Sequence, residues 1–152
     1  MIAIREHFSC LFLKILSEQP RGDIESINRL LAQLSESPRQ LDEQKMKELI
    51  RQPNFFLLAA RAPNGNIVGI ASLVIYETLT KSIGDIADVI VDEKHRSKGI
   101  GQRLIEELIG FAKVKKLNCI ELTSRPEREA ANRLYLKLGF QKRDTNCYRL
   151  TL

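Results

Sequence analysis

The stretch Gly84–Leu104 constrains the fold more than any other part of the chain. It contains an apolar run, Ile86–Val91, then a polar turn with Gly99 and Gly101, and then a segment with helical apolar spacing. A strand, a glycine-rich turn and a helix in this order form a pocket for an anion. Glycine lets backbone N–H groups approach the anion, and the helix N-terminus adds partial positive charge. The stretch therefore predicts an α/β protein that binds a phosphorylated ligand.

Two common phosphate-binding loops do not match this stretch. A Walker loop has lysine directly after its last glycine, whereas here Lys98 precedes Gly99 and Gln102 follows Gly101. A dinucleotide-binding G-x-G-x-x-G that starts at Gly99 requires glycine at position 104, which is Leu104. Both loop types are excluded.

Two short motifs resemble one known family. Arg96–Gly101, which reads RSKGIG, resembles the R/Q-x-x-G-x-G/A signature of the GNAT family of N-acetyltransferases. Leu134–Phe140, which reads LYLKLGF, resembles the L-Y-x-K-x-G-F segment near the end of the same family's domain. The first motif alone also fits a glycine turn without a ligand, but two motifs in the right order are specific. The resemblance extends from about Leu11 to the C-terminus.

The resemblance implies a site for acetyl-coenzyme A (acetyl-CoA). In this family the strand before the loop lends backbone groups to the pantetheine arm, which implies that role for Val89, Ile90 and Val91. The loop holds the pyrophosphate through backbone N–H groups, and basic side chains add charge. The residues with this implied role are Arg96, Ser97, Lys98, Gly99, Ile100 and Gly101.

Two residues of the second motif region inherit further roles from the resemblance. Tyr135 matches the tyrosine that supplies or steadies a proton for the departing thiolate, although an aromatic residue that packs on the sheet is the alternative. The family usually has asparagine where this chain has Arg128. Asn132 lies about one helical turn later and is the candidate replacement for that coenzyme contact.

The general base is predicted from strand parity. The family often has a glutamate on the central strand, and the aligned position here is Ala87, which cannot ionise. Side chains alternate along a strand, so Asp85 shares the face of Ala87 and Asp88 is expected on the other face. Asp85 is therefore the predicted base, with ordered water as the alternative, and Asp88 is expected to be a structural carboxylate.

Composition narrows the class of protein. The 152 residues predict one domain over 1–152, with residues 1–10 as a loose arm or an extra strand. The net charge is +5, but the basic residues are interspersed with acidic ones along the chain, which disfavours a nucleic-acid binder. Three cysteines without a C-x-x-C pair and only two histidines predict neither a disulfide framework nor a metal site. The short N-terminal apolar run fits neither a signal peptide nor a membrane span, so the predicted location is cytoplasmic.

The apolar patterns predict a mixed, mostly antiparallel central sheet with helices on both faces, which is the acyl-CoA acyltransferase fold of the GNAT family. Helices are expected from a cap at Asp23, over Leu41–Gln52, after the glycine loop, and from a capping box at Ser124 to Gly139. The expected strands are Leu11–Ser17, Phe55–Arg61, Ile67–Glu77, Ile86–Val91, Asn118–Thr123 and a closing hairpin of Phe140–Arg143 with Cys147–Leu152.

The leading functional hypothesis is an N-acetyltransferase that moves an acetyl group from acetyl-CoA to a primary amine by direct transfer, without a metal. The alternative is a non-catalytic acyl-CoA-binding sensor or interaction module. The acceptor stays open between small amines, antibiotics, amino acids and protein amines. No nucleic-acid or membrane partner is expected, and a homodimer is one option for the assembly.

Overall fold

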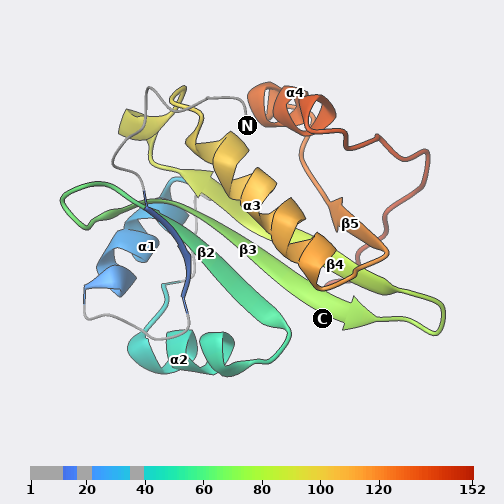
Figure 1. Cartoon of the computed structure of the whole chain (residues 1–152), viewed down its shortest axis with the longest axis horizontal. Coiled ribbons are helices and arrows are strands. Elements are labelled where there is room, and N and C mark those ends of the chain that lie inside the picture. The colour runs from blue at the N-terminus through green and yellow to red at the C-terminus, as the bar shows by residue number, and fades with distance from the viewer. Residues whose placement is uncertain (1–11, 17–21, 35–39) are drawn as a thin grey trace.

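A computed structural model describes residues 12–16, 22–34 and 40–152 of the chain. One five-stranded sheet in the order β1-β2-β3-β4-β5 carries helices on both faces (Figure 1). The strands are β1 (Phe12–Ile15), β2 (Phe55–Arg61), β3 (Ile67–Glu77), β4 (Ser82–Val91) and β5 (Cys119–Leu122). The helices are α1 (Asp23–Ala32), α2 (Glu43–Arg51), the 3-10 helix η1 (Glu93–His95), α3 (Ile100–Val114) and α4 (Glu129–Lys137).

The ladder pattern confirms the predicted class of sheet. The first four strands pair antiparallel with their neighbours, and β4 and β5 pair parallel. A parallel pair needs a long crossover, which α3 supplies. The interpretation of residues 1–10 as an arm or strand, and both ends of the expected first strand, lie outside the described residues.

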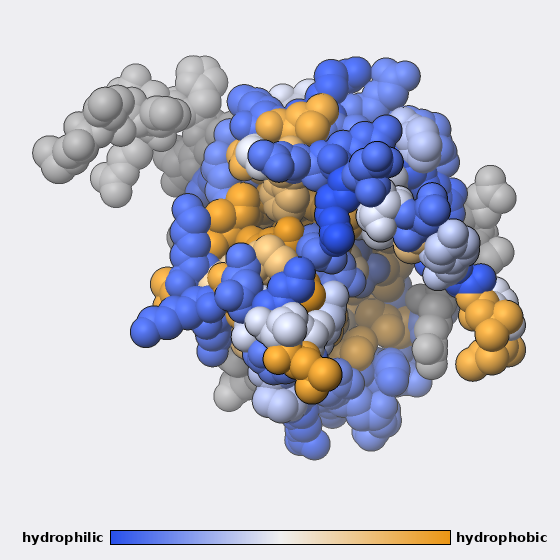
Figure 2. All heavy atoms as spheres, turned by 90° about the vertical axis from the view of Figure 1, so that its right-hand side faces the viewer, coloured by the Kyte–Doolittle hydropathy of each residue, from blue (hydrophilic) through white to orange (hydrophobic). Residues whose placement is uncertain are grey.

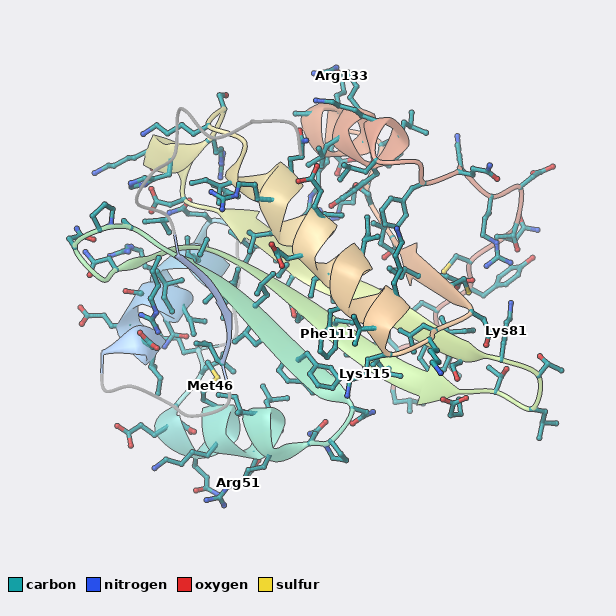
Figure 3. All side chains as sticks on the ribbon, viewed as in Figure 1. Met46, Arg51, Lys81, Phe111, Lys115 and Arg133 are labelled. Carbon is teal, nitrogen blue, oxygen red and sulfur yellow. The ribbon has the colours of Figure 1, made fainter. Side chains whose placement is uncertain are left out.

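Helix α3 covers one face of the sheet, as its apolar stripe predicts. Leu104, Ile105 and Leu108 are each 0% exposed. Near the end of the helix, the Phe111 ring lies 4.7 Å from the ring of Phe56 on β2 (Figure 3). The buried residues of this core are Leu58, Ala60, Val68, Ala71, Leu73, Ile86, Ile100, Leu104, Ile105 and Leu108.

Helices α1 and α2 cover the opposite face. Met46 of α2 is turned toward the sheet and is 1% exposed, whereas Arg51 extends away from it (Figure 3). The buried residues of this second core are Leu16, Ile27, Leu30, Met46, Leu57, Ala59, Ile67, Ile70 and Ile90. The sheet is thus buried on both sides over β2, β3 and the last part of β4.

The predicted cap of α1 at Asp23 is wrong. Gly22 is the cap, with a left-handed φ of 99°, and Asp23 is the first helical residue. Its buried carboxylate accepts a hydrogen bond of 2.7 Å from Nη1 of Arg61. A charged partner on β2 therefore takes the carboxylate that a local cap would need, because charge-assisted hydrogen bonds are stronger than neutral ones.

The predicted capping box of α4 at Ser124 is also wrong, although the predicted helix end is right. The helix starts at Glu129, after a turn in which the Arg128 N–H donates to the Arg125 carbonyl over 3.1 Å. The end is at the expected glycine, because Gly139 has a φ of 92° and its N–H donates to the Leu136 carbonyl.

The expected C-terminal hairpin is not formed. Residues 138–152 contain no strand, and residues 141–152 are all exposed. The alternating apolar residues of the segment, Tyr148, Leu150 and Leu152, are 84% to 111% exposed. A two-stranded hairpin is marginal unless its apolar side chains pack against other elements, and those of this segment are exposed to solvent. Figure 2 shows the side of the molecule that carries this segment, with apolar surface near its middle between hydrophilic side chains.

We expect the α3 contact to dominate stability. Leu104→Ala, at a side chain that is 0% exposed, should lower the free energy of unfolding by about 2–5 kcal/mol, because it leaves a cavity against β3. The matched variant Leu136→Ala, at a side chain that is 61% exposed on α4, should change it by about 0.5 kcal/mol or less. Urea unfolding of both variants measures the difference, and equal losses would contradict this packing.

Candidate active site

Strand β4 is longer than its ladder with β5. In the described part of the chain this ladder ends at the pair Ile86 and Leu122, while β4 continues along β3 to Val91. The residues of β4 after Ile86 therefore border a gap beside β5. An unpaired strand edge offers N–H and C=O groups to an extended ligand.

The three strand residues Val89, Ile90 and Val91, for which the same pantetheine role is predicted, do not all face this gap. The N–H of Asp92 donates to the Val68 carbonyl on β3 over 2.9 Å. Backbone groups alternate in direction along a strand, so the N–H and C=O groups of Ile90 also face β3. The Ile90 side chain is 4% exposed and lies in the core. The backbone groups of Val89 and Val91 face the gap, as a contact with an extended ligand would require, whereas those of Ile90 face β3.

A β-bulge interrupts β4 at Asp88. The register with β3 shifts between Ile70 and Ser72, so that β4 has one extra residue there. Asp88 has a φ of 50°, and its Oδ2 accepts a hydrogen bond of 3.0 Å from Ser72 Oγ. Ser72 pairs with Ala87, so its side chain lies on the face that Asp85 shares. The predicted placement of Asp88 on the other face is wrong, because the bulge breaks the alternation.

Asp85 lies in an acidic, partly buried environment on this face. Burial raises the pKa of its carboxyl group, and the negative charges of Glu121 and Asp88 raise it further. Glu121 is the residue of β5 that pairs with Asp85, and its carboxylate accepts a hydrogen bond of 2.7 Å from Arg143. The predicted base thus has a raised affinity for a proton.

The loop between β4 and α3 presents backbone N–H groups. Ser97 and Gly99 both have left-handed φ values, 59° and 75°, and Gly99 caps α3. The first turn of α3 has no acidic side chain, so no charge of its own neutralises the positive end of the helix. Successive N–H groups at such a turn form a concave site for an anion.

The side chains of the loop divide between anchoring and charge. Ile100 is 3% exposed and fixes the start of α3 in the core. Arg96 is exposed, and its Nε donates to the Val91 carbonyl over 3.1 Å. Lys98 is exposed as well, and its Nζ donates to the Lys94 carbonyl over 3.3 Å. Both cationic side chains therefore lie at the loop with their charge open to solvent.

The two sequence motifs meet at Gly101. A Cβ atom at this position would lie 3.6 Å from Cγ2 of Val91 and 3.7 Å from Cδ2 of Leu134. A second contact joins the helices, because Lys137 of α4 donates to the side chain of Gln102 over 3.1 Å. The end of β4, the glycine loop and α4 therefore converge on one place.

Tyr135 is half-buried on the α3 side of the sheet. Its ring packs edge-on against Phe140 at a centroid distance of 5.9 Å. Burial raises the pKa of the phenol, and the nearby positive charge of Arg128 opposes that shift. The phenol holds its proton at neutral pH with or without this shift, so it is available as a proton donor. The contact with Phe140 also supports the alternative, in which Tyr135 only packs on the sheet.

Arg128 and Asn132 both have backbone partners. Arg128 donates from Nη2 to the Leu34 carbonyl at the end of α1 over 3.5 Å. The Asn132 amide donates to the carbonyls of Arg125 and Pro126, at 3.0 Å and 3.4 Å. Asn132 thus holds the turn before α4, and its contact with the coenzyme stays a prediction.

The described residues contain neither a group of side chains that could bind a metal nor a helix that could cross a membrane. No group of three His, Cys, Asp or Glu side chains that could hold a metal ion occurs in residues 12–16, 22–34 and 40–152. Over the same ranges, no helix has the length and the apolar composition needed to cross a membrane.

A mixed sheet that opens beside a glycine loop and a helix N-terminus defines a class of acyl-transferring enzymes, and sequence comparison identifies the family. A profile of the acetyltransferase (GNAT) family matches residues 16–140. The chain belongs to this family, and its enzyme class is N-acetyltransferase.

Two relatives illustrate the similarity. Glucosamine 6-phosphate N-acetyltransferase of Trypanosoma brucei brucei is 31% identical over 137 residues, which cover 86% of this chain and 89% of that protein. N-alpha-acetyltransferase RimI of Mycobacterium tuberculosis is 27% identical over 122 residues, which cover 80% of this chain and 75% of that protein.

Solved structures share the fold. The crystal structure of a Trypanosoma brucei acetyltransferase has a TM-score of 0.77 and 30% identity, covering 93% of this chain and 99% of that one. An aminoglycoside acetyltransferase from an uncultured soil metagenomic sample has a TM-score of 0.85 over 96% of this chain and 99% of that one. Its identity is 21%, so this likeness concerns the fold alone.

Proposed function

We propose that the protein transfers an acetyl group from acetyl-CoA directly to a primary amine. The observation that carries this proposal is the continuity of the β4 edge with the glycine loop. One extended ligand with an amide-rich arm and a pyrophosphate fits both features. The GNAT family normally uses acetyl-CoA, which supports this identification of the ligand.

The geometry of the site supports the following binding roles. Val89 and Val91 offer backbone hydrogen-bonding groups at the gap to the pantetheine arm. The N–H groups of the loop and of the first turn of α3 face the pyrophosphate, and Arg96 and Lys98 add positive charge. The coenzyme is a co-substrate here, and no step of the reaction is assigned to a metal.

The reaction needs a neutral amine, an oriented thioester and a proton for the leaving sulfur. Asp85 accepts a proton from the acceptor ammonium, and the amine nitrogen then attacks the thioester carbonyl carbon. A C–N bond forms as the C–S bond breaks, and Tyr135 donates a proton to the departing thiolate. The newly acylated nitrogen loses its second proton to bound water, which reprotonates the Tyr135 phenolate, and Asp85 releases the first proton to solvent.

The acceptor is proposed to be a cationic amine. Asp85, Asp88 and Glu121 place negative charge on one face of the sheet, which attracts an ammonium group. The names of the relatives point to amines of different sizes: an amino-sugar phosphate, a protein α-amine and an aminoglycoside. These acceptors belong to those proteins, and they form the first panel for a turnover screen of this one.

The second candidate is a non-catalytic acyl-CoA-binding module. The observation in its favour is Ala87, which cannot ionise at a position where this family often has a glutamate. The two functions differ in product. An enzyme releases free coenzyme A in proportion to acetylated amine, whereas a sensor binds acetyl-CoA with no thiol release over the acceptor panel.

Binding tests the loop assignment. Gly101→Val should weaken coenzyme A binding strongly, because a branched side chain beside Val91 in the first turn of α3 blocks the close approach of the pyrophosphate to the backbone N–H groups. The matched control is Gly110→Val on the same helix, where a Cβ has no neighbour within 4 Å. Calorimetric titration with coenzyme A measures both, and an unchanged affinity in a folded Gly101→Val protein would exclude this loop as the binding site.

Kinetics test the role of Tyr135. Tyr135→Phe should lower kcat by roughly 10²-fold with little change in KM for acetyl-CoA, because only the proton donor is lost. Tyr148→Phe, at a side chain that is 87% exposed, is the control and should keep the parent rate. A loss of coenzyme affinity and thermal stability in Tyr135→Phe, with kcat retained, would support the packing role instead.

The pH dependence of kcat/KM tests the base. Asp85 acts only when deprotonated, and its raised pKa places the start of activity at higher pH than for an ordinary aspartate. Asp85→Asn should lose rate mostly at low pH, where little amine is neutral, and recover toward the parent at high pH. Asp88→Asn, on the same face, is the control and should keep the pH profile of the parent if Asp85 is the base. A parallel profile for Asp85→Asn at every pH would exclude Asp85 as the base.

A further inference from the structure

Asp92 is a buried carboxylate at the point where β4 becomes the glycine loop. Its exposure is 7%, and its backbone N–H is fixed to the Val68 carbonyl on β3. A buried carboxylate is costly unless charged or hydrogen-bonding partners surround it. Hydrogen bonds from His95, Lys94 and Gln33 outweigh burial and lower the pKa of Asp92, so the group is ionised in the folded protein.

One oxygen of Asp92 holds the loop. Oδ1 accepts a hydrogen bond of 3.0 Å from the Lys94 N–H and lies 3.2 Å from Nδ1 of His95. These contacts start the 3-10 helix η1, which leads directly into the residues with left-handed φ values and then into α3. The direction of the N–H groups in the anion site therefore depends on how Asp92 sets this turn.

The other oxygen of Asp92 faces α1. Oδ2 accepts a hydrogen bond of 3.4 Å from Nε2 of Gln33 and lies 3.9 Å from Nε of Arg29. Gln33 also accepts a hydrogen bond of 3.0 Å from the Glu93 N–H, so its amide bonds the carboxylate and the loop backbone together. Arg29 and Gln33, at the end of α1 and far from the glycine motif in sequence, thus bind the start of the loop.

We propose that Asp92 is a positioning residue for the coenzyme, and that Gln33 and Arg29 clamp it so that the pyrophosphate loop keeps one orientation. This inference rests on the proposed coenzyme site. The clamp touches neither the phosphates nor the reacting atoms. It acts by fixing the N–H groups in advance, and small displacements of such supporting groups reduce binding strongly.

Gln33→Met removes both amide contacts and keeps the length of the side chain. The dissociation constant for coenzyme A should rise about tenfold, because hydrogen bonds to a charged group and to the loop are lost. The matched control is Gln44→Met on α2, whose amide bonds only Glu48 at the exposed surface, at 2.9 Å. Its affinity should stay within about twofold of the parent.

A kinetic split separates positioning from a general structural role. In Gln33→Met, KM for acetyl-CoA should rise in step with the dissociation constant while kcat stays within about twofold of the parent. Asp92→Asn, which keeps the shape and removes the charge, should show the same split. Adding Gln33→Met to Asp92→Asn should cost little more affinity, because both act in one clamp. If Asp92→Asn does not fold, Gln33→Met decides the question alone.

The outcomes also separate this proposal from the proposed function. Unchanged coenzyme A affinity in a folded Gln33→Met protein, together with weakened binding in Gly101→Val, overturns the clamp and leaves the loop assignment standing. Unchanged affinity in both variants overturns the loop assignment as well. A fall in kcat at constant affinity in Gln33→Met also overturns the clamp, because positioning of the pyrophosphate loop acts on binding.

Discussion

The unequal pairing of β4 is the constraint on which the site depends. β4 pairs with β3 to its last residue, Val91, but with β5 only through the four residues from Ile83 to Ile86. After Leu122 the chain turns toward α4, so within the described residues no strand pairs with this last part of β4, although the Val91 carbonyl accepts a hydrogen bond from Arg96. The same strand leads into the glycine loop. The proposed contacts with the pantetheine arm and with the pyrophosphate therefore both depend on this strand, along its edge and at its end.

Local patterns predicted most of the fold. The α3 stripe and the helix end at Gly139 depend on residues within a few positions of one another. Hydrophobic spacing and glycine conformation are properties of such short segments, which is why they can be read without the tertiary structure. The two family motifs also depend on local sequence, and the structure brings them together at Gly101.

The predictions that were wrong involve partners from distant parts of the chain. Asp23 does not cap α1 because Arg61, which lies on β2, takes its carboxylate. Asp88 does not follow strand parity because a bulge inserts one residue, and Ser72 of β3 holds its side chain. The apolar alternation of residues 147–152 predicted a strand, but a strand also needs a surface to cover. The sequence analysis also missed Glu121 as a neighbour of Asp85, because only the parallel register between β4 and β5 places the two residues side by side.

The two predicted catalytic side chains lie on opposite faces of the sheet. Tyr135 packs with the α3 core, whereas Asp85 shares the face of Ser72, where α1 and α2 lie. In a continuous sheet these faces are separated by the hydrogen-bonded backbone. They can serve one reaction only where the ladder is interrupted, which in this chain is beyond the pair of Ile86 and Leu122.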